Sequence, residues 1–164
     1  MTMVGGDKSI IERNSKHTSL FTTFITFLFS LLLFFKVNPE TTSVQMEERI
    51  DILPNFFINY VVGVDNINIL FIVLTAFICF VITMFNFYYE SEKSKFFYIF
   101  LLLLEGTTIG AFASQNLMLF FLFFEATLIP LFMIIGLKAD QQEKENAFKY
   151  ALVSMFSAMI ILPA

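Results

Sequence analysis

Residue types that usually carry chemistry in enzymes are scarce in this sequence. Its 164 residues include one Cys, one His and no Trp. The single cysteine, Cys79, excludes an internal disulfide. It lies in an apolar run without metal-ligand spacing, so we interpret it as a small buried hydrophobe. His17 precedes the first apolar run, and we interpret it as an interfacial residue rather than a ligand.

The sequence also lacks a glycine fingerprint for phosphates, a cysteine cluster and a basic patch with interleaved aromatic residues. The first two absences argue against a nicotinamide, flavin or iron–sulfur group in this chain. The third argues against nucleic acid as a partner. We therefore expect this chain to hold no cofactor and no metal.

Charged residues are the last scarcity, and they point to a class of protein. They make up 15% of the chain, and hydrophobic residues make up 57%. Typical soluble domains have about 25% charged and about 45–50% apolar residues. Both departures predict a membrane protein, whose partners include lipid.

Four apolar runs are long enough to cross a bilayer, and a fifth reaches the C-terminus. Crossing about 30 Å of hydrocarbon takes roughly 20 helical residues. Runs such as LLLLEG do not alternate with a period of two, so membrane β-strands are excluded and helices remain. The expected spans are 18–35, 67–89, 96–113, 117–137 and 146–164. The predicted fold is all-α, a polytopic transmembrane bundle of about five helices.

Basic residues distinguish the two sides of this predicted bundle. With five alternating spans, eight basic residues fall on one side of the bundle and two on the other. The eight are Lys8, Arg13, Lys16, Lys93, Lys95, Lys138, Lys144 and Lys149, and the two are Lys36 and Arg49. Because cytoplasmic and matrix loops are the basic ones, segment 1–17 is expected on that side and loop 36–66 opposite. Within the loop, apolar residues 55–62 are too few to span and predict an interfacial or re-entrant piece.

Two acidic residues, Glu105 and Glu125, fall inside predicted spans. The polar break at 114–116 predicts a tight antiparallel hairpin, and each glutamate lies ten residues from Gln115. At 1.5 Å per residue, both lie about 15 Å from the turn, near the midplane and at the same depth. The sequence does not fix whether they face each other.

A carboxyl group at this depth is protonated, paired with a cation or in contact with internal water. Such a group can take up and release protons when a neighbouring charge moves, and it indicates function by default. The alternative is a neutral glutamate that links two helices by hydrogen bonds. No basic residue lies mid-span. The nearest is Lys149, in the first turn of the fifth predicted helix, where it either joins a polar path or extends to the interface.

Smaller features accompany Glu125. Pro130 removes the hydrogen bond to the carbonyl of Ala126, so we expect a bend or loosening near the acid. Thr107 and Thr127 could bond freed backbone groups or water. Ser154 and Ser157 give the fifth predicted helix a polar stripe. Each of these residue types more often serves packing than function.

The stretch LLLLEGTTIGAFASQNLMLFFLFFEATLIPLFMIIG resembles subunit 4 of NADH:ubiquinone oxidoreductase, respiratory complex I, and its bacterial counterpart. The run FFEATLIP is its most specific part. NYVVGVDNINILFIVLTAF, FKVNPETTSVQMEERIDILP and EKENAFKYALVSMFSAM are similar to neighbouring parts of that family. The resemblance covers nearly the whole chain, from Leu20 onward.

The resemblance implies an antiporter-like subunit that translocates protons across the mitochondrial inner membrane, with its N-terminus in the matrix. Glu125 matches a glutamate that the family pairs with a lysine of a later helix. Glu105 matches an acid of the preceding helix, and Lys149 a position that is often basic. Ubiquinone, FMN and iron–sulfur clusters are expected elsewhere in the complex. The chain alone is not expected to be catalytic, although it is part of an oxidoreductase.

The sequence also departs from the family. The family's first helix and everything after its sixth are missing, including the lysines, so we expect an N-terminal fragment completed by a second chain. DNIN replaces DGIS, and Lys138-Ala139-Asp140 replaces a Trp-Gly pair. Expected partners are that second chain and other antiporter-like and membrane-arm subunits. Two alternatives stay open: a purely structural membrane subunit, and a subunit of a multisubunit sodium/proton antiporter.

Overall fold

The computed structural model describes residues 4–41, 43–53, 58–89 and 95–137, together with residues 142, 143, 145, 146, 149, 153 and 154. The described helices and strands, in chain order, are α1 Val4–Lys36, β1 Gln45–Leu53, β2 Ile58–Val64, α2 Asn68–Tyr88, α3 Lys95–Ala113 and α4 Leu117–Gly136. Four described helices are long and apolar enough to cross a membrane. The predicted class, a transmembrane helix bundle, is confirmed. Most of the expected fifth span, 146–164, lies outside the described residues.

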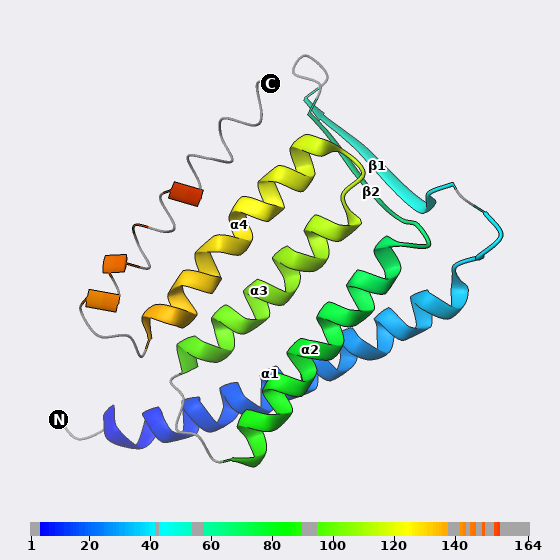
Figure 1. Cartoon of the computed structure of the whole chain (residues 1–164). Helices are drawn as coiled ribbons and strands as arrows, with labels where there is room; N and C mark the ends of the chain where they lie inside the picture. The colour runs from blue at the N-terminus through cyan, green and yellow to red at the C-terminus, as the bar shows by residue number, and fades with distance from the viewer. Residues whose placement is uncertain are drawn as a thin grey trace.

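The helices pack with α2, α3 and α4 side by side and α1 crossing α2 and α3 (Figure 1). On α2 the buried residues recur every three or four positions and so form one face; they are Ile69, Ile72, Ala76, Cys79, Thr83 and Asn86. That face packs inward between α1 and α3. The outward faces carry large exposed apolar side chains such as Phe29, 63% exposed, and Phe85, 57% exposed. Such a surface suits a lipid environment and not water.

Helix α1 extends further toward the N-terminus than the span expected at 18–35. It begins at Val4, and its membrane-compatible part covers Arg13–Lys36. Hydropathy detects only the apolar part of a helix, whereas backbone hydrogen bonds continue through polar residues such as Asn14 and Ser15. The N-terminal segment is therefore mostly helical.

A β-hairpin occupies much of the loop at 36–66. β1 and β2 pair antiparallel, with Arg49 opposite Val61 and Ile50 opposite Tyr60. An interfacial or re-entrant piece was expected at 55–62. Its described part, residues 58–62, is no span and pairs within β2, and its place at the membrane interface stays a prediction. Residues 54–57 lie outside the described part. Strand pairing satisfies backbone groups that an unpaired apolar segment near lipid would leave without partners.

The hairpin contacts the turn between α3 and α4, the turn predicted from the polar break at 114–116. The backbone N–H of Gln115 donates to the carbonyl of Val61 at 2.9 Å, and its side-chain Nε2 donates to the carbonyl of Gly63 at 3.0 Å. Asn116 caps α4 by accepting from the N–H of Met118 at 2.8 Å. The hairpin thus holds the two acid-bearing helices together at one end (Figure 1).

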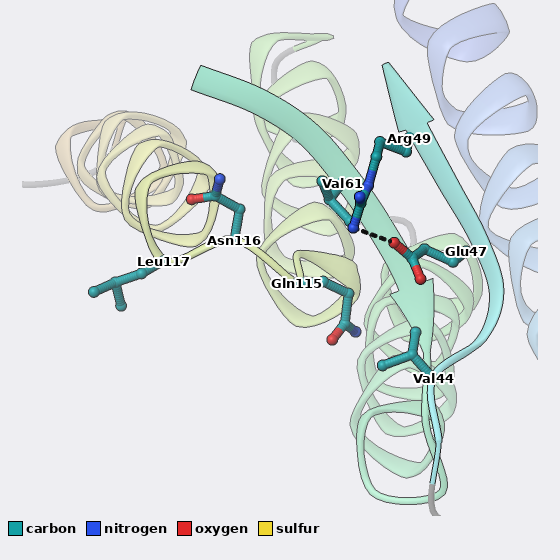
Figure 2. A pocket seen from close by; sticks show the side chains of 7 residues that line it. All are labelled: Val44, Glu47, Arg49, Val61, Gln115, Asn116 and Leu117. Carbon is teal, nitrogen blue, oxygen red and sulfur yellow. Dashed lines mark hydrogen bonds and ion pairs between the residues drawn. The ribbon is translucent and has the colours of Figure 1, made fainter. Parts of the chain in front are cut away.

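An open cavity of about 440 Å³ lies where the hairpin meets this turn (Figure 2). Arg49 and Glu47, both on β1 at its edge, form an ion pair at 3.0 Å, and both are well exposed, at 65% and 41%. An exposed pair of this kind contributes about 0–1 kcal/mol, so the hydrogen bonds of Gln115 matter more for the position of the turn.

Candidate functional site

Glu105 is one of the most deeply buried polar residues of the described structure. It is 3% exposed and shares one face of α3 with Tyr98 and Leu101, both 2% exposed. Helix α3 packs against α1, α2 and α4 in the bundle. The Oε1 atom of Glu105 is buried and has no hydrogen-bond partner among the described residues. Among the described residues, no basic side chain forms an ion pair with this carboxyl group.

Glu125 lies on the outermost described helix, α4, and is less covered than Glu105. The residue is partly exposed, but its Oε1 atom is buried and lacks a hydrogen-bond partner within the described part of the chain. Pro130 is the only buried residue that the structure describes on α4, and Leu122 is 59% exposed. The surface around Glu125 is thus open on one side of the helix.

A close contact between α3 and α4 gives the sides of the two helices on which the glutamates lie. Gly110 lets the helices approach, because a Cβ at this position would lie 2.8 Å from the ring of Phe123. Glu105 precedes Gly110 by five residues and so lies about 140° around α3 from this contact. Glu125 follows Phe123 by two residues, about 200° around α4. Both residues therefore lie on other sides of their helices than the Gly110–Phe123 contact.

The other predicted site residues take ordinary positions. Lys149 is helical and exposed, and no ion pair joins it to Glu105 or Glu125 in the described structure. Helix α4 continues through the buried Pro130, so the helix is not interrupted there. Thr127 donates to the carbonyl of Phe123 at 2.8 Å. The roles of Lys149 and of a bend at Pro130 stay predictions. Ser157 lies outside the described residues.

The sequence analysis overlooked a set of uncharged polar side chains at the centre of the bundle. Ser19, Thr23, Thr83 and Asn86 are all 4% exposed or less. Because these side chains are uncharged, they do not stand out within an apolar span as a charged residue does. A signal was present, because Thr83 and Asn86 continue the helical period of Cys79. Buried threonines can donate to the carbonyl of their own helix, as Thr83 does at 2.8 Å.

The chemistry available to this site is that of isolated carboxyl groups in an apolar helix bundle. Among residues 4–41, 43–53, 58–89, 95–137 and the seven described beyond them, no group of three His, Cys, Asp or Glu side chains could hold a metal ion. A buried carboxyl can exist in neutral and charged forms whose balance depends on nearby charge and water. The arrangement can therefore hold and release protons.

Comparisons with known proteins agree on one group. Residues 114–164 match the family model described as NADH:quinone oxidoreductase/Mrp antiporter, transmembrane. NADH-quinone oxidoreductase subunit M of Rhodobacter capsulatus is 37% identical over 160 residues, covering 97% of this chain and 30% of that protein. NADH-ubiquinone oxidoreductase chain 4 of Marchantia polymorpha is 33% identical over 147 residues, or 89% of this chain and 30% of that protein. The Arabidopsis thaliana chain 4 is 33% identical over 141 residues, covering 85% of this chain and 28% of that protein. The chain thus spans about 30% of the length of the relatives it matches.

Proposed function

The chain belongs to the family of NADH-quinone oxidoreductase subunit M and NADH-ubiquinone oxidoreductase chain 4, and on this premise we propose that it acts in the membrane arm of respiratory complex I. The proposed activity is proton translocation coupled to electron transfer from NADH to ubiquinone. Glu105 and Glu125 are the proposed proton carriers. Electron transfer itself, with its FMN, iron–sulfur clusters and ubiquinone, is assigned to other subunits.

One observation carries the assignment to the two glutamates. Their Oε1 atoms are buried and lack hydrogen-bond partners among the described residues. Burying a polar group without a partner is unfavourable, so a purely structural role gives little reason for either residue. A carboxyl whose protonation changes during turnover accounts for both the burial and the missing partner.

The partner of Glu125 is proposed to come from beyond residues 1–164. On α4, Glu125 lies about 200° around the helix from Phe123, the residue that contacts Gly110 of α3. A lysine on a further helix, either of a continuing polypeptide or of a second chain, would complete an ion pair there. Lys149 is a weaker candidate because it is exposed in the structure. Other antiporter-like and membrane-arm subunits are the expected neighbours.

The proposed location is the mitochondrial inner membrane, with the N-terminus in the matrix. The chain 4 proteins of Marchantia polymorpha, Chondrus crispus and Arabidopsis thaliana support the mitochondrial part of this proposal. The uneven distribution of basic residues supports the orientation. Lys16 and Lys95 stand at the starts of two spans, whereas Lys36 ends α1 at the opposite end of the bundle.

A sodium/proton antiporter subunit is the second candidate, because the matching family model covers both kinds of protein. The relatives named above are oxidoreductase subunits, and they favour complex I. Ion transport that needs Na⁺ and continues without NADH oxidation would favour the antiporter.

The test is Glu125→Gln in the assembled complex, reconstituted into closed vesicles. Glutamine keeps the shape of the side chain but cannot ionise. We expect NADH oxidation to continue while the number of protons moved per NADH falls. Glu40→Gln, an exposed residue of the loop after α1, is the matched control and leaves the ratio unchanged. An unchanged ratio in Glu125→Gln would contradict the proton-carrier role and favour a structural subunit.

A further inference from the structure

The outer surface between α1 and α3 carries a cavity that the proposed function does not use. Its volume is about 290 Å³, it is open to the outside, and we call it the α1–α3 groove. The residues that line it include Asn14, Ser15 and Thr18 on α1 and Tyr98, Ile99 and Leu102 on α3. Because its open surface is mostly apolar, an occupant with a long apolar part suits it better than water does.

The α1–α3 groove lies at the end of the bundle where both helices enter the membrane. The two spans are Arg13–Lys36 and Lys95–Ala113, and the lining residues fall within the first eight positions of each. The polar layer of a bilayer is about 5–7 Å thick on each side, since hydrocarbon takes up about 30 Å of a total of about 40–45 Å. The groove therefore begins in the headgroup layer and continues beside the acyl chains.

The residues of α3 show how the groove changes with depth. A lysine at the start of a span extends to the lipid headgroups, which gives the level of Lys95. Tyr98 lies about 4.5 Å further along the helix axis, and Leu102 about 10.5 Å further. Tyr98 is thus at the level of the glycerol esters, and Leu102 is at the level of the acyl chains.

Positive charge is concentrated at the same end of the two helices. The charged residues in the first eight positions of the two spans are all basic, and they are Arg13, Lys16 and Lys95. Lys95 lies on the groove side of α3, because the three lining residues of this helix follow it at i+3, i+4 and i+7. The charge at the mouth of the groove is therefore complementary to an anion.

The ammonium group of Lys95 is available to such an anion. The residue is half-buried, and its Nζ atom lies 5.3 Å from the centroid of the Phe96 ring. Within the part of the chain that the structure describes, no carboxylate forms an ion pair with Lys95. The flexible four-carbon stem lets the ammonium reach a phosphate at the mouth of the groove. Basic sites between transmembrane helices on the matrix or cytoplasmic side suit anionic lipid headgroups.

We propose that the α1–α3 groove binds one phospholipid with an anionic headgroup. The lipid phosphate pairs with the ammonium of Lys95, and the exposed side-chain amide of Asn14 donates to oxygens of the headgroup. One acyl chain lies against Ile99 and Leu102. The lipid bridges the first turns of α1 and α3. This site is independent of proton transport, so its test does not depend on pumping.

The test is photochemical labelling of the assembled complex in vesicles. The vesicles contain a small share of a phospholipid with a diazirine in its acyl chain, either anionic phosphatidylglycerol or zwitterionic phosphatidylcholine. After illumination and digestion, mass spectrometry identifies the labelled residues of this chain. We expect phosphatidylglycerol to label Ile99 and Leu102 about fivefold more than phosphatidylcholine does. One basic residue near a membrane surface contributes about this factor to the affinity for an anionic lipid.

Leu103 is the internal control for these labels. It is 52% exposed and adjacent to Leu102 on α3, but it does not line the groove. Both probes should label Leu103 equally. Lys95→Gln should abolish the fivefold preference at Leu102, and Lys95→Arg should keep it. Lys36→Gln, at the opposite end of α1, is the matched control and should leave the preference unchanged.

Two results would overturn the lipid site, and the wild-type complex alone can give either of them. In the first, both probes label Leu102 as evenly as they label Leu103, so the groove holds only bulk lipid. In the second, Leu103 is labelled but Ile99 and Leu102 are not, so a protein segment covers the groove. Failure of Glu125→Gln to affect pumping would instead contradict the proposed function and leave the labelling result standing.

Discussion

Replacement of Glu105 by leucine should make the chain more stable and the complex less active. Glu105 is 3% exposed, and its Oε1 atom lacks a partner in the described structure. Leucine has a similar volume, so little cavity or overpacking is expected. The substitution removes a desolvated polar group without a hydrogen bond, whose cost is about 1–3 kcal/mol. We expect the free energy of unfolding to rise by about that amount.

The assay is unfolding of the purified chain in bicelles by added SDS, followed by circular dichroism. Glu105→Gln is the control, because it keeps a polar group in the same place and should change stability by less than about 1 kcal/mol. In the assembled complex both variants should lose proton translocation. If Glu105→Leu lowered the stability by more than about 1 kcal/mol, the carboxyl would be making a stabilising bond. The reasoning on a functional, energetically costly acid would then fail.

Two further predictions concern the helices that carry the acids. Gln115→Ala removes the hydrogen bond to the Gly63 carbonyl and should lower the free energy of unfolding by about 0.5–1.5 kcal/mol in the same assay. An unchanged free energy of unfolding would mean that the hairpin does not support the turn. Gly110→Ala places a Cβ 2.8 Å from the Phe123 ring, whereas nothing lies within 4 Å of a Cβ at Gly106. Gly106→Ala should therefore stabilise α3 by about 0.5–1 kcal/mol. The Gly110→Ala variant should be about 1–3 kcal/mol less stable than the Gly106→Ala variant. Equal stabilities of the two variants would contradict the close α3–α4 contact.

The apolar runs predicted most of the helical framework. Segments expected at 67–89, 96–113 and 117–137 correspond to α2, α3 and α4 with ends within one residue. The agreement arises because the apolar run in the sequence has the same length as the helix that spans the lipid. The start of α1 at Val4 could not be read in the same way, since a helix that leaves the membrane keeps its backbone bonds but loses its apolar pattern.

The β-hairpin and the interior face were harder to predict for a different reason. Strand β2 depends on pairing with the charged segment of β1, and no pattern within either segment predicts this contact. The sides of α3 and α4 that meet depend on the close approach at Gly110, which is set by tertiary packing. The sequence does not distinguish Tyr98 from the other aromatic residues of the spans. In the structure it differs from them by being buried beside a cavity.

The central claim is that buried carboxyl groups of this chain change protonation during turnover. Infrared difference spectroscopy of the assembled complex tests it most directly, by comparing resting and NADH-reduced states in the carbonyl-stretch region of protonated carboxylic acids. Labelling glutamate with ¹³C identifies the glutamate bands. We predict a glutamate band that appears or disappears on reduction and is lost in Glu125→Gln. A difference spectrum that is identical in the wild type, Glu125→Gln and Glu105→Gln would contradict the account.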